Sequence, residues 1–262
     1  MSQEKIFIEN HGQKLAAVMH VPVDPTKVGI ILVHGFTSSK REEAGDKYAR
    51  LADALCNKGF LVLRFDFRGH GESEGLFEDT SLSSESSDLN KMISFLKENG
   101  IEKIGVVGCS LGGFVTLLTY HNNMDCVVLW YPAIFLKESD IFKEMKSREK
   151  ELEKDGKLFA RQLEGKKYYI GKQMWEEWNS IDVFSKVKDV KCPILFLTGN
   201  KDVNVDPSQS EKAFAVASEP KRLEIIDGAA HAWRDEDWNL VEGYFLHATK
   251  LTVDWFVEWL KP

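Results

Sequence analysis

Six short apolar runs constrain the fold of this chain more than any other feature of its sequence. They are rich in valine, isoleucine and leucine, and they span residues 28–33, 60–65, 104–107, 126–130, 194–197 and 223–226. Runs of this length without regular polar alternation are typical of strands buried on both faces. We therefore expect a central parallel sheet.

Amphipathic stretches lie between several of these runs. Apolar side chains recur at i, i+3, i+4 and i+7 over 48–55 and 89–96, and Gly59 and Gly100 are the predicted stops. A further helix with an aromatic face is predicted over 251–259. Strands that alternate with helices predict an α/β fold with a doubly wound, mostly parallel sheet. We expect a single domain over all 262 residues.

Two segments depart from this alternation. The start of the chain predicts an antiparallel hairpin, with strands over 5–9 and 14–21 and a turn over 10–12. From about 133 to 185 no strand candidate occurs and mixed charges dominate, which predicts a helical insertion between two core strands. An insertion at this place is where a lid over a functional site is expected.

Composition excludes several classes of protein. The net charge of −7 does not favour a nucleic-acid backbone or an anionic membrane surface as a partner. The first ten residues lack the basic start and apolar stretch of a secretory signal, and no run is long enough for a membrane span. The four cysteines show no metal-binding spacing. We expect a cytoplasmic protein with reduced cysteines and no cofactor or metal.

A candidate nucleophile stands in residues 108–112, which read Gly-Cys-Ser-Leu-Gly and match G-x-S-x-G. Alone this match is weak, since about 0.1 such matches arise by chance in a chain of this composition. Its context adds weight, because a predicted strand precedes it and a predicted helix over 114–120 follows it, as a nucleophile elbow requires. The glycines leave room for a strained turn in which side chains would collide with the chain.

The neighbouring thiol is the rival nucleophile. For Cys109 to occupy the elbow, residues 107 and 111 should be small, but they are Val107 and Leu111. We therefore predict that Ser110 is the nucleophile and that Cys109 is a packed thiol.

A serine hydroxyl needs a base, and the base needs an orienting acid. His231 follows the predicted strand over 223–226, and Asp202 follows the one over 194–197, so both are expected at the sheet edge that carries Ser110. The rival acids are Asp206 and Asp227. Asp206 resembles a helix N-cap, and Asp227 is too close to its own strand to reach behind His231. The order serine, aspartate, histidine is the one expected for such an architecture.

An oxyanion hole is predicted from the loop after the first core strand. Residues 34–37 read His-Gly-Phe-Thr, and the glycine permits a turn that aims a backbone N–H at the site. The expected donors are the amides of Phe36 and Leu111. His34 is expected to shape the loop rather than to act in catalysis.

Together these motifs resemble those of α/β-hydrolases over nearly the full length of the chain. They are HGFT at 34–37, RFDFRGHGES at 64–73, the elbow, GNKD at 199–202 and GAAH at 228–231. Within that superfamily the chain is similar to the bacterial cinnamoyl/feruloyl esterases, which share the first two loops, a following Phe-acidic pair (Phe77-Glu78) and an insertion at the same place. A departure is Cys-Ser-Leu at 109–111, where those esterases usually carry His-Ser-Gln.

The resemblance implies a serine carboxylesterase that cleaves small acyl or aryl esters beneath a helical lid. The same triad also suits a thioesterase, a peptidase or a C–C bond hydrolase, and a non-catalytic binding protein is the remaining alternative. Thr37 and three aromatic residues of the insertion, Tyr169, Trp175 and Trp178, are the candidate pocket residues. Those aromatics alternatively anchor the insertion or make a homodimer contact.

Overall fold

The apolar runs of the sequence form the centre of a sheet that has eight strands in the described part of the chain, in the order β1-β2-β4-β3-β5-β6-β9-β10. This computed structural model describes residues 1–24, 26–41, 45–163, 165–235 and 237–261. The central strands are β3 (Val28–Val33), β4 (Leu61–Phe65), β5 (Lys103–Cys109), β6 (Cys126–Trp130), β9 (Ile194–Gly199) and β10 (Lys221–Ile226).

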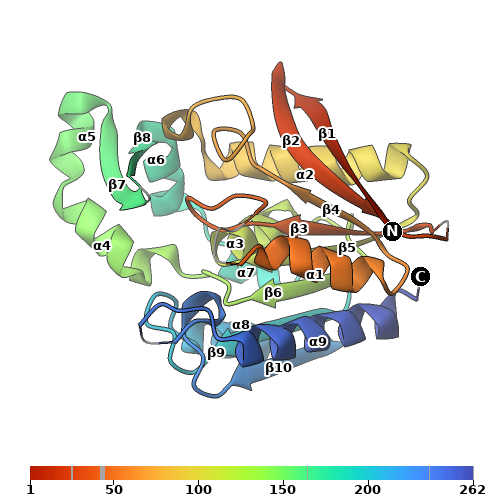
Figure 1. The fold of residues 1–262 in the computed structure, drawn as a ribbon. Helices are drawn as coiled ribbons and strands as arrows, with labels where there is room; N and C mark the ends of the chain where they lie inside the picture. Colours follow the sequence, from red (N-terminus) through yellow and green to blue (C-terminus); the bar gives the residue numbers. More distant parts are fainter. Residues whose placement is uncertain (25, 42–44, 164, 236, 262) are drawn as a thin grey trace.

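In this sheet, strands β4, β3, β5, β6, β9 and β10 run parallel, as the apolar runs predicted. At one edge, β1 (Ser2–Asn10) and β2 (Gln13–Val21) form the expected antiparallel hairpin, and β2 also pairs antiparallel with β4. Figure 1 shows this hairpin rising away from the rest of the sheet. The predicted α/β fold with a mostly parallel sheet is confirmed.

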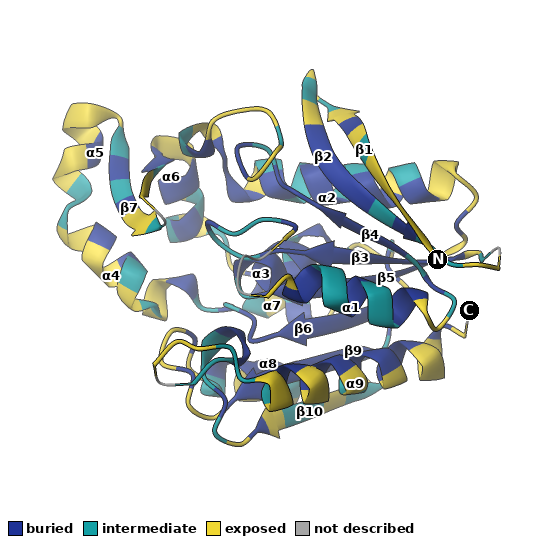
Figure 2. Cartoon of the chain, viewed as in Figure 1, coloured by how far each residue is buried: buried dark blue, intermediate teal, exposed yellow. Residues whose placement is uncertain are grey.

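Two hydrophobic layers cover the sheet because successive strand residues point to opposite faces. On β3, Ile30 faces a layer formed with α1 (Lys47–Cys56) and α9 (Glu242–Trp259). Its neighbour Ile31 faces a layer formed with α2 (Leu82–Glu98), α3 (Leu111–Thr119) and α8 (Ser208–Val216). Strands β3, β4, β5, β6 and β9 are almost entirely buried between these layers (Figure 2), so the alternation of strands and helices yields a three-layer molecule.

The insertion after β6 lies at the end of the sheet where the parallel strands terminate (Figure 1). It contains η2 (Leu136–Glu138), α4 (Asp140–Ser147), α5 (Glu149–Asp155), β7 (Lys157–Leu163), β8 (Lys166–Gly171), α6 (Lys172–Ser180) and α7 (Phe184–Val187). The expectation of no strand between 133 and 185 was therefore wrong, because β7 and β8 form an antiparallel pair. Lysine and arginine side chains on this partly buried pair hide the alternation that would otherwise reveal a strand.

The insertion is attached to the body through η1 (Phe77–Asp79) and α2. The Lys157 ammonium lies 3.0 Å from a carboxylate oxygen of Glu78, and the Ser83 amide donates to the Glu177 carboxylate at 2.8 Å. Gly171, at the end of β8, is so close to the Glu78 carbonyl that a Cβ atom there would lie 2.2 Å from it. Among the described residues, no helix is long and apolar enough to cross a membrane.

Candidate active site

Ser110 lies on a sharp turn between β5 and α3. Its backbone has φ 53° and ψ −120°, a conformation that L-residues rarely adopt. The surrounding main chain holds it there, since the Ser110 amide donates to the Trp130 carbonyl and the Ser110 carbonyl accepts from the amides of Gly113 and Ala133. Backbone hydrogen bonds therefore hold Ser110 in its strained conformation, with its hydroxyl at the end of the buried strand β5.

The two glycines that flank this turn have the steric reason that the sequence predicted. A Cβ atom at Gly108 would lie 2.5 Å from the Thr116 hydroxyl, and one at Gly112 would lie 2.5 Å from the His34 carbonyl. Neither position therefore has room for a side chain while Ser110 keeps its place. Cys109 is buried, as expected.

Asp202 and His231 come together although 29 positions separate them in the chain. The imidazole Nδ1 lies 2.7 Å from Asp202 Oδ2, and Asp202 Oδ1 accepts hydrogen bonds from the amides of Asn204 and Val205 at 2.9 Å. Asp202 is only 4% exposed. The carboxylate is therefore fixed in position with one oxygen left for the imidazole, and this fixes the orientation of the ring.

The rival acids are bonded elsewhere. The Asp206 carboxylate accepts from the Ser208 amide at the start of α8, although the N-cap position itself is Pro207. The Asp227 carboxylate accepts from the Asn200 side chain. In the described residues, Asp202 is the only carboxylate that pairs with His231.

Tyr131 contacts the imidazole as well, and sequence reasoning missed it. It follows β6, and its ring lies 4.7 Å from the ring of His231 and 5.0 Å from that of Trp233. Its φ of 38° and its 2.6 Å hydrogen bond to the Leu197 carbonyl fix the backbone. Its place in the sequence could have identified it, because it directly follows a buried strand that ends at the same sheet edge as β5 and β9.

The loop after β3 approaches Ser110 closely. A Cβ atom at Gly35 would lie 3.1 Å from Ser110 Cβ, so only glycine fits there without displacement. His34 shapes this loop, since its Nδ1 donates to the Gly35 carbonyl and its Nε2 accepts from the Phe67 amide. The neighbouring Phe36 packs against Trp178, with ring centroids 5.2 Å apart.

A cavity of about 760 Å³ joins these groups. Ser110 and His231 both line it. Among the described residues, no hydrogen bond joins these two side chains. Catalytic hydrogen bonds of this kind often form only when substrate is bound. Phe36, Leu111 and the predicted pocket residues Thr37 and Trp178 also line it. The cavity is large enough for a small organic ester.

The other two predicted pocket residues lie outside the described lining of this cavity. Trp175 stacks on Phe142 and donates its indole N–H to Glu149, within the insertion. Tyr169 packs against Phe159 on the neighbouring strand. Both therefore stabilise the insertion, which is the other role that the sequence left open for them.

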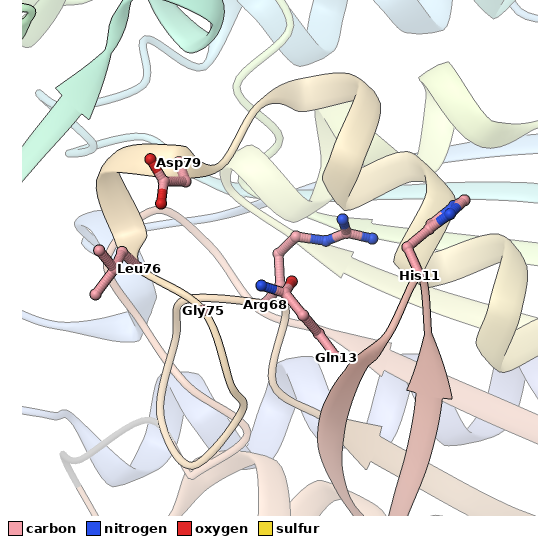
Figure 3. A pocket seen from close by; sticks show the side chains of 6 residues that line it. All are labelled: His11, Gln13, Arg68, Gly75, Leu76 and Asp79. Atoms are coloured by element: carbon pink, nitrogen blue, oxygen red, sulfur yellow. The ribbon is translucent and has the colours of Figure 1, made fainter.

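A second and smaller hollow, of about 210 Å³, lies beside the tip of the N-terminal hairpin (Figure 3). Its described lining is His11, Gln13, Arg68, Gly75, Leu76 and Asp79. The Arg68 guanidinium is bound there by the buried Asp88 carboxylate, at 2.6 and 3.0 Å, so its charge is neutralised within the protein. In the described residues, no group of side chains is arranged to hold a metal ion.

Comparison with known proteins agrees with this architecture. Residues 24–165, more than half of the chain, match the family model described as serine aminopeptidase, S33, a family of hydrolases. The chain belongs to this family. Its membership confirms the predicted resemblance to the α/β-hydrolases.

Relatives of this S33-family hydrolase include an acyl transferase of Photobacterium leiognathi, which is 26% identical over 196 residues. That match covers 71% of this chain and 63% of the relative, so it spans less than two thirds of the relative's length. Another is a probable alcohol acetyltransferase of Cyberlindnera fabianii, 33% identical over 124 residues that make up 44% of this chain and 31% of the relative.

The fold of this family member is similar to that of Est1E from Butyrivibrio proteoclasticus, solved with ferulic acid bound. The TM-score is 0.78 at 19% identity, with 98% of this chain and 100% of that one covered. The Pyrococcus furiosus esterase Pf2001 is also similar, with a TM-score of 0.73, 22% identity and coverage of 99% and 92%. These likenesses confirm the expected fold.

Proposed function

We propose that this hydrolase is a serine carboxylesterase that cleaves small acyl or aryl esters through an acyl-enzyme. The observation that carries the proposal is the convergence of a strained Ser110 elbow and an oriented Asp202–His231 pair on one cavity. A hydroxyl, an imidazole and a carboxylate in this arrangement supply a nucleophile, its base and the group that orients the base.

The proposed reaction has two steps. His231 Nε2 accepts the Ser110 proton while Oγ bonds to the ester carbonyl carbon, and the imidazolium then protonates the alcohol as the carbon–oxygen bond breaks. In the second step water gives a proton to His231 and attacks the acyl-enzyme, which releases the acid and returns the proton to Ser110. Asp202 stabilises the imidazolium in both steps, because its Oδ2 faces Nδ1 at 2.7 Å.

The oxyanion is proposed to bind the amides of Phe36 and Leu111. Leu111 is the first residue of α3, where a helix N–H has no partner within the helix and the helix dipole favours negative charge. Phe36 follows the glycine that lies against Ser110. Two amides from opposite sides of the serine are the usual composition of an oxyanion hole.

Ester cleavage is favoured over the aminopeptidase activity in the family's description. A free α-amino group requires a carboxylate that is available to bind it. Asp140 and Glu144 are described acidic residues of the cavity lining, but Lys143 lies 3.0 Å from the first and Arg148 lies 3.7 Å from the second. An ester makes no such demand on the cavity.

The decisive experiment is labelling with a fluorophosphonate probe. The wild-type protein and Cys109→Ala should be labelled, whereas Ser110→Ala should not be, because only the hydroxyl at the elbow is activated. Ser110→Ala should also lose activity toward p-nitrophenyl acetate by about a thousandfold or more. Equal labelling of Ser110→Ala and wild type would overturn the assignment of the nucleophile.

A substrate panel tests the class of bond. We expect kcat/KM to be highest for p-nitrophenyl esters of short acids and lower for the matching thioesters and for aminoacyl p-nitroanilides. A preference for the p-nitroanilides would instead assign the protein as a peptidase. Methyl ferulate belongs in the same panel, since the fold resembles that of Est1E.

A further inference from the structure

Two arginine side chains that line the candidate active site have no carboxylate partner among the described residues. Arg161 lies on β7 of the insertion, and Arg234 follows His231 by three positions. Neither forms an ion pair with any described carboxylate. This differs from Arg68 of the small hollow (Figure 3), whose guanidinium is bound by the Asp88 carboxylate.

The acidic side chains of the same cavity do not neutralise these arginines. Asp140 lies 3.0 Å from Lys143, and Glu144 lies 3.7 Å from Arg148. The two guanidinium charges are therefore not paired with a described carboxylate of the lining, although the chain as a whole carries a net charge of −7. Two such groups in an acidic protein need an explanation within the site itself.

Arg234 is held in a fixed position with donors to spare. Its Nη1 donates to the Trp238 carbonyl at 2.7 Å, and its guanidinium lies 5.3 Å from the centroid of the Trp238 ring. Its Nε–H is buried and has no hydrogen-bond partner in the described residues. The remaining N–H groups form a planar fork that suits two oxygens of a carboxylate or phosphate.

The backbone of Arg234 is also fixed relative to the imidazole. Its carbonyl accepts from the amide of Ala230, next to His231, and it pairs with Leu240 in an antiparallel bridge. Since the imidazolium must protonate the departing alcohol, that alcohol lies on the His231 side of the scissile bond. Arg234 lines the same cavity and follows this histidine closely in the chain, which makes it a candidate to contact the alcohol part.

From these observations we infer that the natural ester carries an anionic group, a carboxylate or phosphate, on its alcohol part, and that Arg234 binds this group. Trp238 is 48% exposed and also lines the cavity. Its ring supplies an apolar surface beside the guanidinium. Arg161 adds positive charge from the insertion. The inference rests on the proposed esterase function and names its substrate class.

The test compares a charged ester with a neutral one. The substrates are 4-acetoxybenzoate and its amide, 4-acetoxybenzamide, with the acetyl ester of 4-hydroxyphenyl phosphate as a second anionic substrate. The readout is the ratio of kcat/KM for the anionic ester to that for the neutral ester. We expect Arg234→Gln to lower this ratio by about tenfold or more, because a hydrogen-bonded charge pair is lost.

Several controls make the result specific. Arg222→Gln changes an exposed arginine on β10, outside the cavity, and should leave the ratio at the wild-type value. Arg234→Lys keeps the charge but not the fork and should give an intermediate ratio. Product inhibition by 4-hydroxybenzoate should weaken in Arg234→Gln, whereas inhibition by 4-hydroxybenzamide should not.

The outcomes separate this inference from the proposed function. An unchanged ratio in an Arg234→Gln protein that still reacts with fluorophosphonate overturns the inference and leaves the esterase standing. A larger fall for the phosphate ester than for the carboxylate identifies the anion as phosphate. If the wild type neither reacts with fluorophosphonate nor cleaves any of the esters, the proposed function is overturned and the inference with it.

Discussion

The two carboxylate oxygens of Asp202 have different partners, and this difference decides what the residue can do. Oδ1 accepts two backbone amides, which fixes the side chain, while Oδ2 is directed at His231 Nδ1. An oriented acceptor of this kind selects one tautomer of the imidazole, with its proton on Nδ1 and its lone pair on Nε2. The neighbouring Tyr131 ring limits the movement of the imidazole.

Asp202→Asn is therefore expected to keep the fold and to lose activity. The amide preserves the size of the side chain but can present an N–H to Nδ1, which would reverse the tautomer. We expect kcat for p-nitrophenyl acetate to fall by about a thousandfold or more. Asp206→Asn and Asp227→Asn are matched controls that should remain within about threefold of wild type. A similar loss of kcat in either control would instead assign to that aspartate the role of orienting His231.

At the scale of elements, the insertion is placed over the site by a few close contacts. The β7–β8 pair lies against η1 through Lys157 and Gly171, and α6 brings Trp178 to the cavity. The same insertion carries Arg161. Its attachment therefore determines part of the shape and charge of the cavity.

Gly171→Ala tests this attachment. The new methyl group would lie 2.2 Å from the Glu78 carbonyl oxygen, so the insertion must move away from η1. We expect the free energy of unfolding to fall by about 1–3 kcal/mol and KM to rise, with a smaller effect on kcat. Thermal unfolding and steady-state kinetics measure both effects. Gly243→Ala, on α9 with open space around the added carbon, should change stability by less than about 1 kcal/mol.

At the scale of the whole molecule, stability is expected to depend on pH through a buried histidine. His70 donates from Nδ1 to the Arg68 carbonyl and packs 4.9 Å from the rings of His34 and Phe77. Burial, with a smaller contribution from His34, lowers its pKa from 6.5 to about 3. The pKa of His20 is lowered as well, mainly by burial.

The sign of this effect follows from proton binding. Between pH 3 and 6.5 the unfolded chain binds a proton at His70 that the folded protein does not, so stability falls as the pH is lowered through this window. From pH 6.5 to about 5.5 the free energy of unfolding should fall by about 1 kcal/mol more in wild type than in His70→Gln. Urea unfolding at each pH measures this difference. Parallel curves for the two proteins would contradict it.

Local sequence patterns determined most of the fold. Apolar runs and helical periodicity depend on residues within one or two turns of each other, and they predicted the parallel strands, the hairpin and the main helices. The elbow was predictable for the same reason, because the glycine requirement at 108 and 112 arises from backbone within the same turn and the strand beside it. The partly buried β7–β8 pair was missed because its charged side chains obscure any alternation.

The sequence by itself placed Ser110, Asp202 and His231 at one edge, because the ends of parallel strands meet there. Only the tertiary structure decided that Tyr131 packs on the imidazole, that Trp178 rather than Trp175 or Tyr169 lines the cavity, and that Arg234 lacks a carboxylate partner among the described residues. The physical reason is the range of the interactions. Periodicity and backbone strain act between near neighbours, whereas packing and charge pairing depend on which distant segments meet.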